Sequence, residues 1–402
     1  MFNKKNVFED KVELYPKVSM VEQLFIALFI LSLVMSSISI FPFGISKFGD
    51  SGGVKLYHIL SFLLFGFLFL KFKKIAGFSS LFFIFILYIL VYSLMCALLY
   101  EMDIMMANYI YCAFIFYLGT WISSLISTSK LTALLSKIAI AFSLIVIFKI
   151  FIFKSVIIAF LASPWGHPML PSISGGGLNI ESSWLAMMTI FGYKNKKVYF
   201  PLLIVAFIVS LLYASRAGTL ICVYSYLAYL FLNVQNKNKI VGIISIFALL
   251  CIAIGFVFYL STKDLYVVER FTSVGDDPGS LGRLALWKWI IPAFLNNPLG
   301  YGPGNAIKAV TDISQTTFIE NNVHLYPAQI LLDFGLIGFI VYIFIVIKIF
   351  RGSFSRNLGV RVFYIFLLSY ILLGLIQFRG ADPLPFLLAG FVFSKKNKWS
   401  EE

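Results

Sequence analysis

Arg216 has a setting that suggests anion binding. It follows Ser215 in the sequence Tyr213-Ala-Ser-Arg-Ala-Gly-Thr219, where one apolar run ends and the next begins. Ser215 can cap a helix that begins there, so that free N–H groups and the guanidinium face the same water layer. The pattern predicts an anion site. The alternative is that Arg216 only extends its charge to the interface of a membrane.

Two further arginines, Arg270 and Arg283, lie in the longest hydrophilic stretch of the chain. Guanidinium groups suit bidentate binding of phosphate. Each arginine also has an acid nearby, Glu269 for Arg270 and Asp276 or Asp277 for Arg283, so plain surface ion pairs remain the alternative. Three arginines on one face favour an anionic substrate more strongly than any one of them.

His324 is the candidate for proton transfer. It stands in Asn321-Asn-Val-His-Leu-Tyr-Pro327, just before a proline suited to the first turn of a helix. A neutral imidazole at that place can act as a general base. A lone histidine can also have a purely structural role, and His58 and His167 are weaker candidates.

Acidic residues near the predicted outer face form a second group. Glu181, in Gly175-Gly-Gly-Leu-Asn-Ile-Glu-Ser-Ser-Trp184, opens an apolar run, and a carboxylate at membrane depth is costly enough to indicate a purpose. Capping of its own helix is the alternative. We expect Arg379 and Asp382 to pair with each other.

These residues must be positioned by helices that cross a membrane. Of the 402 residues, 60% are hydrophobic and 12% are charged, where soluble domains average about 25% charged residues. The composition excludes a soluble enzyme, a disordered chain and a disulfide-stapled secreted domain. We predict an all-α polytopic membrane protein with about 12 transmembrane helices. Their expected bounds are 21–41, 54–70, 75–100, 104–126, 131–153, 178–193, 198–214, 216–233, 240–261, 326–350, 361–378 and 383–394.

The charge pattern predicts the orientation of these helices. Lysines and arginines collect in every second connection, as they do in cytoplasmic loops. Both termini are therefore expected in the cytoplasm, and the net charge of +14 needs no nucleic acid to explain it. Residues 262–324 become one large periplasmic loop, with an interfacial helix near 284–295 that contains Trp287 and Trp289. We expect residues 1–402 to form a single integral membrane domain.

The motifs that are missing narrow the chemistry. The sequence contains no G-x-x-x-x-G-K-[ST], no H-E-x-x-H and no C-x-x-C. We therefore expect no nucleotide, no metal and no other cofactor, and catalysis would draw its driving force from an activated substrate.

Three segments carry a family resemblance. The stretch Asn297-Pro-Leu-Gly-Tyr-Gly-Pro-Gly-Asn305, then Asn322-Val-His-Leu, then Leu332-Asp-Phe-Gly-Leu-Ile-Gly338 resembles the characteristic region of the O-antigen polymerase/ligase family. Ser215-Arg216 at the start of a helix is similar as well. The resemblance covers roughly residues 210 to 345 and the overall layout. Asp333 stands where the family pattern usually has glutamate.

The resemblance implies a glycosyltransferase that takes a glycan from undecaprenyl diphosphate on the periplasmic face of the bacterial inner membrane, without a metal. It implies that Arg216 and Arg270 hold the diphosphate, that Arg283 supports it, and that His324 deprotonates the acceptor hydroxyl. Undecaprenyl-diphosphate-linked oligosaccharide and membrane lipids would be the partners, with a chain-length regulator protein as a further one. The supporting residues would be Glu181, Asp333 and Arg379.

Polymerase and ligase are hard to separate from sequence. We favour an O-antigen polymerase, which joins repeat units on the lipid carrier. Glu181-Ser-Ser-Trp resembles a segment of some exopolysaccharide polymerases, and the phenylalanine usage, 44 of 402 residues, resembles that of AT-rich antigen gene clusters. The alternative is a ligase that moves the glycan to lipid A core. A lipid-linked oligosaccharide flippase or another transporter is the second alternative, disfavoured because the polar candidates gather at one edge rather than at midplane.

Overall fold

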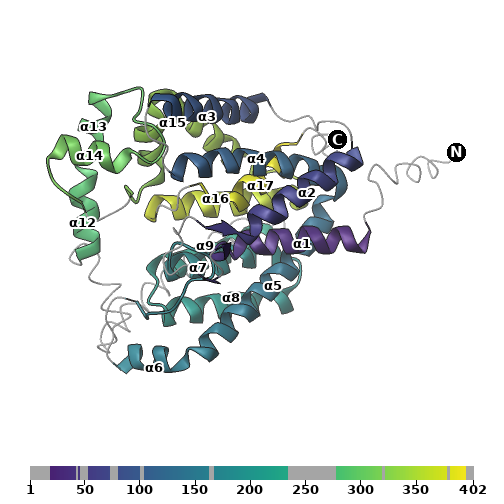
Figure 1. Ribbon diagram of the computed structural model, residues 1–402. Helices are drawn as coiled ribbons and strands as arrows, with labels where there is room; N and C mark the ends of the chain where they lie inside the picture. The colour runs from purple at the N-terminus through teal and green to yellow at the C-terminus, as the bar shows by residue number, and fades with distance from the viewer. Residues whose placement is uncertain are drawn as a thin grey trace.

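The computed structural model describes residues 19–41, 44–45, 53–72, 80–99, 104–162, 167–233, 278–318, 322–377 and 381–394. Most of these residues are helical (Figure 1). The helices are α1 (Met20–Val34), α2 (Leu56–Phe72), α3 (Ser80–Leu99), α4 (Ile104–Leu125), α5 (Thr128–Ile152), α6 (Lys154–Ala162), α7 (Leu178–Met188), η1 (Thr189–Gly192), α8 (Lys196–Leu212), α9 (Arg216–Asn233), α12 (Pro278–Trp287), α13 (Ile290–Asn296), α14 (Ala306–Ser314), α15 (Tyr326–Gly352), α16 (Leu358–Ile376) and α17 (Pro383–Phe393).

The helices have the length and surface of a membrane protein. Four of those in the described residues are long and apolar enough to cross a membrane: Met105–Leu125, Thr128–Ile152, Tyr326–Gly352 and Leu358–Ile376. On α5, Leu144 and Phe148 are more than 60% exposed, whereas Phe142 and Val146 on the opposite face are fully buried. An exposed apolar face of this kind fits lipid. The chain is an all-α multi-pass membrane protein, and its predicted twelve spans and cytoplasmic termini stay predictions.

The first predicted span, 21–41, is wrong at its end. Helix α1 stops at Val34, and the chain continues into a small antiparallel sheet of β1 (Ile38–Phe41), β2 (Gly44–Ile45) and β3 (Val54–Lys55), in the order β2-β1-β3. Serine and isoleucine alternate from Ser37 to Ile40, and this period of two suits a strand. Hydropathy alone cannot see the change because the segment stays apolar.

Helix α15 is also not the straight span predicted over 326–350. Gly335 has φ 67° and ψ −168° inside it, which breaks the helix into two parts. The rings of Tyr326 and Tyr342, one on each part, lie edge to face with their centroids 5.6 Å apart. The two parts therefore fold sharply toward each other. A non-glycine residue would be strained at this backbone conformation.

Helices α4 and α17 pack backbone to backbone in the core. A Cβ atom added at Gly119 would lie 2.1 Å from the carbonyl oxygen of Leu387, and one added at Gly390 would lie 1.9 Å from that of Phe116. Small residues let membrane helices approach this closely, and van der Waals contact then holds them together. The pair forms part of the packed centre of the bundle.

The segment predicted as an interfacial helix near 284–295 consists of two helices, α12 and α13, separated at Lys288 and Trp289. In Figure 1, α12, α13 and α14 gather at one end of the bundle. Two contacts hold α12 there: the Trp287 indole donates to the Val323 carbonyl at 2.8 Å, and Arg283 Nη1 donates to the Ile376 carbonyl at 3.4 Å. Their place at a membrane surface stays a prediction.

Candidate active site

A tight turn between α8 and α9 sets the position of Arg216. The N–H of Ser215 donates to the Ser210 carbonyl at 2.8 Å and that of Ala214 to the Leu211 carbonyl at 2.9 Å, which is the Schellman pattern of a helix end. Ala214 takes the left-handed conformation, with φ 49°. The predicted cap is confirmed, because Ser215 Oγ accepts the N–H of Gly218 at 3.0 Å. Arg216 is thus the first residue of α9, at the positive end of its helix dipole.

Helix α7 holds this turn from the side. The Ser182 hydroxyl donates to Ser215 Oγ at 2.8 Å. His167 lies between Tyr213 and Asn179: its Nδ1 is 2.7 Å from the Tyr213 carbonyl oxygen, and its Nε2 is 3.2 Å from Asn179 Nδ2. His167, which is a weaker candidate from the sequence, therefore lies beside the turn that carries Arg216.

Gly218 allows α7 and α8 to approach α9. A Cβ atom at this position would lie 2.3 Å from Ser182 Oγ and 2.5 Å from Ser210 Oγ. The glycine of the Ser-Arg-Ala-Gly segment is thus required for this packing.

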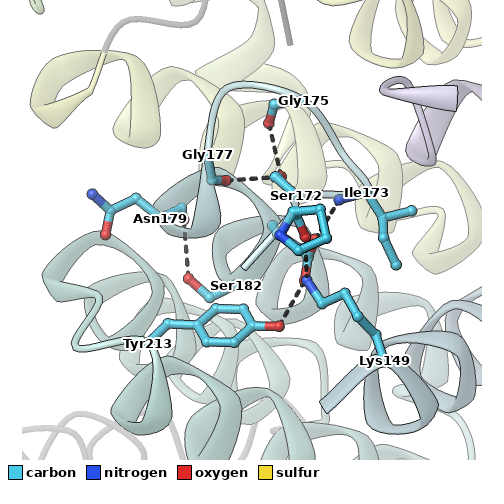
Figure 2. Close-up of polar contacts among 10 residues, drawn as sticks. Lys149, Ser172, Ile173, Gly175, Gly177, Asn179, Ser182 and Tyr213 are labelled. Atoms are coloured by element: carbon cyan, nitrogen blue, oxygen red, sulfur yellow. Dashed lines mark hydrogen bonds and ion pairs between the residues drawn. The ribbon is translucent and has the colours of Figure 1, made fainter. Parts of the chain in front are cut away.

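Glu181 lies in the interior rather than at an open site. It is 0% exposed, and its carboxylate forms an ion pair with Lys149. Glu181 Oε1 also accepts the Tyr213 hydroxyl at 2.8 Å, and Oε2 accepts the N–H of Ile173 at 2.6 Å. Figure 2 shows Lys149 and the Tyr213 hydroxyl converging on this point. The carboxylate does not cap its own helix, since these partners come from other segments.

Lys149 is the residue that sequence reasoning missed. It lies within an apolar run of α5, and its side chain is 6% exposed. The signal that could have found it is that Lys149 and Glu181 both lie inside predicted spans, because charges inside such spans occur mostly in pairs.

His324 adopts a backbone conformation that is rare for a residue with a side chain, with φ 53°. Neighbouring groups hold this turn. The His324 N–H donates to Asn322 Oδ1 at 2.9 Å, and the N–H of Val323 donates to Gln329 Oε1 at 3.1 Å. The Val323 carbonyl accepts the Trp287 indole. Such a conformation persists only where the surroundings fix it, and it occurs often at functional sites.

Asp333 is joined to the histidine turn through one side chain. It is 0% exposed, and its Oδ2 accepts Gln329 Nε2 at 3.0 Å. Gln329 therefore links Asp333 to the backbone of Val323. The acid that departs from the family pattern supports the histidine turn from inside the helix.

The break at Gly335 is matched by the glycine-rich loop between α13 and α14. The Tyr301 N–H donates to the Leu332 carbonyl at 2.8 Å, and the Leu336 N–H donates to the Pro298 carbonyl at 2.9 Å. A Cβ atom at Gly335 would lie 2.4 Å from the carbonyl oxygen of Leu299, so the two backbones touch. The loop thus satisfies polar groups that the break would leave unpaired, and the two motifs of the family resemblance form one unit.

The predicted site residues fall into two groups in the described residues. Glu181 and Arg216 share the α7–α9 region, and Arg283, His324 and Asp333 share the end of the bundle near α12. A row of rings on three helices connects the groups. The Tyr370 ring of α16 lies 6.3 Å from that of Trp184 in α7 and 6.5 Å from that of Tyr326, two residues after His324. Arg270 and Arg379 lie outside the described residues.

The described residues contain no group of three His, Cys, Asp or Glu side chains that could hold a metal ion. Cys96, Cys112 and Cys222 are buried and unbridged. The two groups of site residues offer guanidinium, imidazole, carboxylate and backbone N–H groups, a set suited to binding an anion and moving a proton.

Comparison with known proteins connects the middle of the chain to one family. No curated protein matches the chain. The model of the family described as O-antigen ligase matches residues 201–343, which include Arg216, Arg270, Arg283, His324 and Asp333. Over residues 201–343, about a third of the chain, the sequence is therefore similar to the family described as O-antigen ligase.

Proposed function

We propose that this protein is an O-antigen polymerase, a glycosyltransferase that joins oligosaccharide repeat units carried on undecaprenyl diphosphate at the periplasmic face of the bacterial inner membrane. The observation that carries the proposal is the position of Arg216. It begins α9 directly after the Ser215 cap, inside the matched segment, where a guanidinium and a helix N-terminus act on the same anion.

In this proposal the arginines bind the diphosphate of the donor. Arg216 and Arg270 hold it and Arg283 supports it. Charge-assisted hydrogen bonds of this kind contribute about 1.5–3 kcal/mol each. They matter most as the leaving diphosphate gains negative charge, so loss of Arg216 lowers turnover as well as affinity.

His324 is the general base in this proposal. Its imidazole takes the proton of an acceptor sugar hydroxyl, whose oxygen attacks the anomeric carbon of the donor glycan. A new glycosidic bond forms, the bond from the anomeric carbon to the diphosphate breaks, and the electron pair leaves with the undecaprenyl diphosphate. The donor supplies the driving force, so the proposed reaction uses no cofactor. The fixed turn at His324 supports this role, because a base must be held within hydrogen-bond reach of its proton.

A ligase that transfers the glycan to lipid A core is the second candidate. The observation that favours it is the description of the matching family model, O-antigen ligase. In the polymerase proposal, a chain-length regulator protein is a further partner.

A lipopolysaccharide gel separates the candidates. Cells that lack the gene are complemented with the wild type, His324→Ala or Arg216→Ala at matched membrane expression. A polymerase predicts core with a single repeat unit in the deleted strain and a ladder restored only by the wild type. Bare core, with glycan stranded on the carrier, would identify a ligase. A normal ladder in the deleted strain would overturn both and return attention to lipid-linked oligosaccharide transport.

A further inference from the structure

A buried ion pair lies behind the Arg216 turn. Lys149 of α5 and Glu181 of α7 have side chains that are 6% and 0% exposed. Removing two charges from water is costly, and in a membrane protein such a pair usually marks a function. The proposed chemistry uses neither charge, so the pair needs an explanation of its own.

The two charged groups fasten four segments to one another. The Lys149 ammonium donates to the Pro171 carbonyl at 3.0 Å and lies 5.0 Å from the centre of the Tyr213 ring. Glu181 accepts the Tyr213 hydroxyl and the Ile173 N–H. Helix α5, the chain before α7, α7 itself and the end of α8 therefore meet at one point (Figure 2).

Tyr213 transmits this arrangement to Arg216. It is the last residue before the left-handed Ala214, and Ser215 follows as the cap of α9. The tyrosine is held at both ends, by Glu181 at its hydroxyl and by His167 at its carbonyl. A shift of the ring would move the turn, and the turn carries the guanidinium.

We infer that Lys149 is a positioning residue for Arg216: its ion pair with Glu181 holds the carboxylate on the Tyr213 hydroxyl, and Tyr213 fixes the turn from which Arg216 reaches the anion. The placement of Arg216 follows from the contacts alone, and its effect on glycan transfer rests on the proposed function.

Loss of one partner and loss of both have different consequences. Lys149→Met leaves the Glu181 carboxylate buried without its cation, which is strongly unfavourable, so the contacts around the carboxylate, including that with Tyr213, are disturbed. Lys149→Met combined with Glu181→Gln removes both charges and leaves an amide oxygen that can accept from Tyr213. The amide nitrogen then faces the Ile173 N–H, which loses its acceptor, so the double variant should restore part of the turn that the single variant disturbs.

The first experiment measures the turn without using activity. Arg216→Cys is introduced into the full chain, and the purified protein in detergent is labelled with a methanethiosulfonate reagent, with the wild-type chain, which lacks the introduced thiol, as background. Added Lys149→Met should change the labelling rate of the introduced thiol by about threefold or more. Lys137→Met, on an exposed residue of the same helix, should leave the rate unchanged, and the double variant should return it toward that of Arg216→Cys alone.

Tyr213→Phe serves as a second probe because it removes one hydroxyl and keeps the ion pair. It should change the labelling rate in the same direction as Lys149→Met. Equal labelling rates in the Lys149→Met, Tyr213→Phe and Lys137→Met proteins would overturn the inference.

The second experiment measures glycan transfer by purified protein from a polyprenyl-diphosphate-linked oligosaccharide, with Arg216 in place. Lys149→Met should lower kcat by about tenfold or more per folded molecule, as for a displaced catalytic group. In an Arg216→Lys background the further loss should shrink to about twofold or less, because the positioned group is already altered. An undiminished further loss would show that Lys149 acts elsewhere. Wild-type transfer by Arg216→Ala would overturn the proposed function but leave the labelling result standing.

Discussion

The Tyr213 hydroxyl and the Glu181 carboxylate, 32 residues apart in the sequence, are joined by a hydrogen bond of 2.8 Å. This bond connects the turn that carries Arg216 to the buried face of α7. It also explains why a glutamate is tolerated in the protein interior, since Glu181 has a cation, a hydroxyl and a backbone N–H as partners.

Tyr213→Phe should lower the free energy of unfolding by about 2 kcal/mol, because the lost hydrogen bond involves a charged group. Tyr224→Phe is the matched control: its hydroxyl donates to a neutral carbonyl, that of Ile365, at 3.0 Å, and the expected loss is about 1 kcal/mol. Denaturant unfolding of both proteins in one detergent measures the difference. Equal losses would show that the Tyr213 bond has no special weight.

His324→Gly should abolish activity without lowering stability. Glycine relieves the left-handed backbone at φ 53°, so the protein should unfold at a temperature no lower than the wild type, with a gain of up to about 1 kcal/mol. Glycan synthesis should be lost. His324→Ala should lose activity without the gain in stability. A thermal unfolding scan beside a lipopolysaccharide gel tests this, and an active glycine variant would remove His324 from the chemistry.

Gln329→Leu should weaken the support of the turn at His324. The substitution removes both bonds of a side chain that is 2% exposed, one to Val323 and one to Asp333. We expect a stability loss of about 1–3 kcal/mol and a larger fractional loss of kcat than of substrate affinity. Gln23→Leu, at an exposed position of α1, should change stability by less than about 0.5 kcal/mol. Unchanged kcat in Gln329→Leu would show that the turn does not need its support.

Gly335→Ala should prevent the loop between α13 and α14 from docking on α15. The added methyl group would meet Leu299 backbone atoms at 2.3 and 2.4 Å, in a conformation that alanine disfavours. The expected loss is about 3 kcal/mol or more. Gly66→Ala has open space around it and should change stability by no more than about 1 kcal/mol. The fraction of monodisperse protein and its unfolding temperature measure both, and a stable Gly335→Ala protein would contradict the tight fit.

The sequence predicted the helices well where an apolar run is bounded by polar residues. The run predicted as 216–233 is α9 to the residue, and Ser215 caps it as expected. These features are local, so hydropathy and cap chemistry suffice to find them. The predicted arginines Arg216, Arg270 and Arg283, with His324 and Asp333, also fall inside the matched family segment, whereas Glu181 and Arg379 lie outside it.

The features that sequence reasoning missed are non-local or depend on backbone angles. The pairing of Lys149 with Glu181 depends on the packing of α5 against α7. The spacing of residues in the sequence does not predict that packing. The break at Gly335 lies in an apolar run, and only the backbone angles show it. Likewise β1 begins within a run apolar enough to be read as helix. Tertiary contacts decide such cases.

The backbone contact between α4 and α17 has a consequence for biogenesis. Gly119 of α4 and Gly390 of α17 are far apart in the sequence, and each lies against a backbone carbonyl group of the other helix. During synthesis α4 enters the bilayer long before α17 leaves the ribosome, and domains complete their packing only as later segments arrive. Until α17 arrives, Gly119 lacks the helix against which it packs, so the contact between α4 and α17 is completed late in assembly.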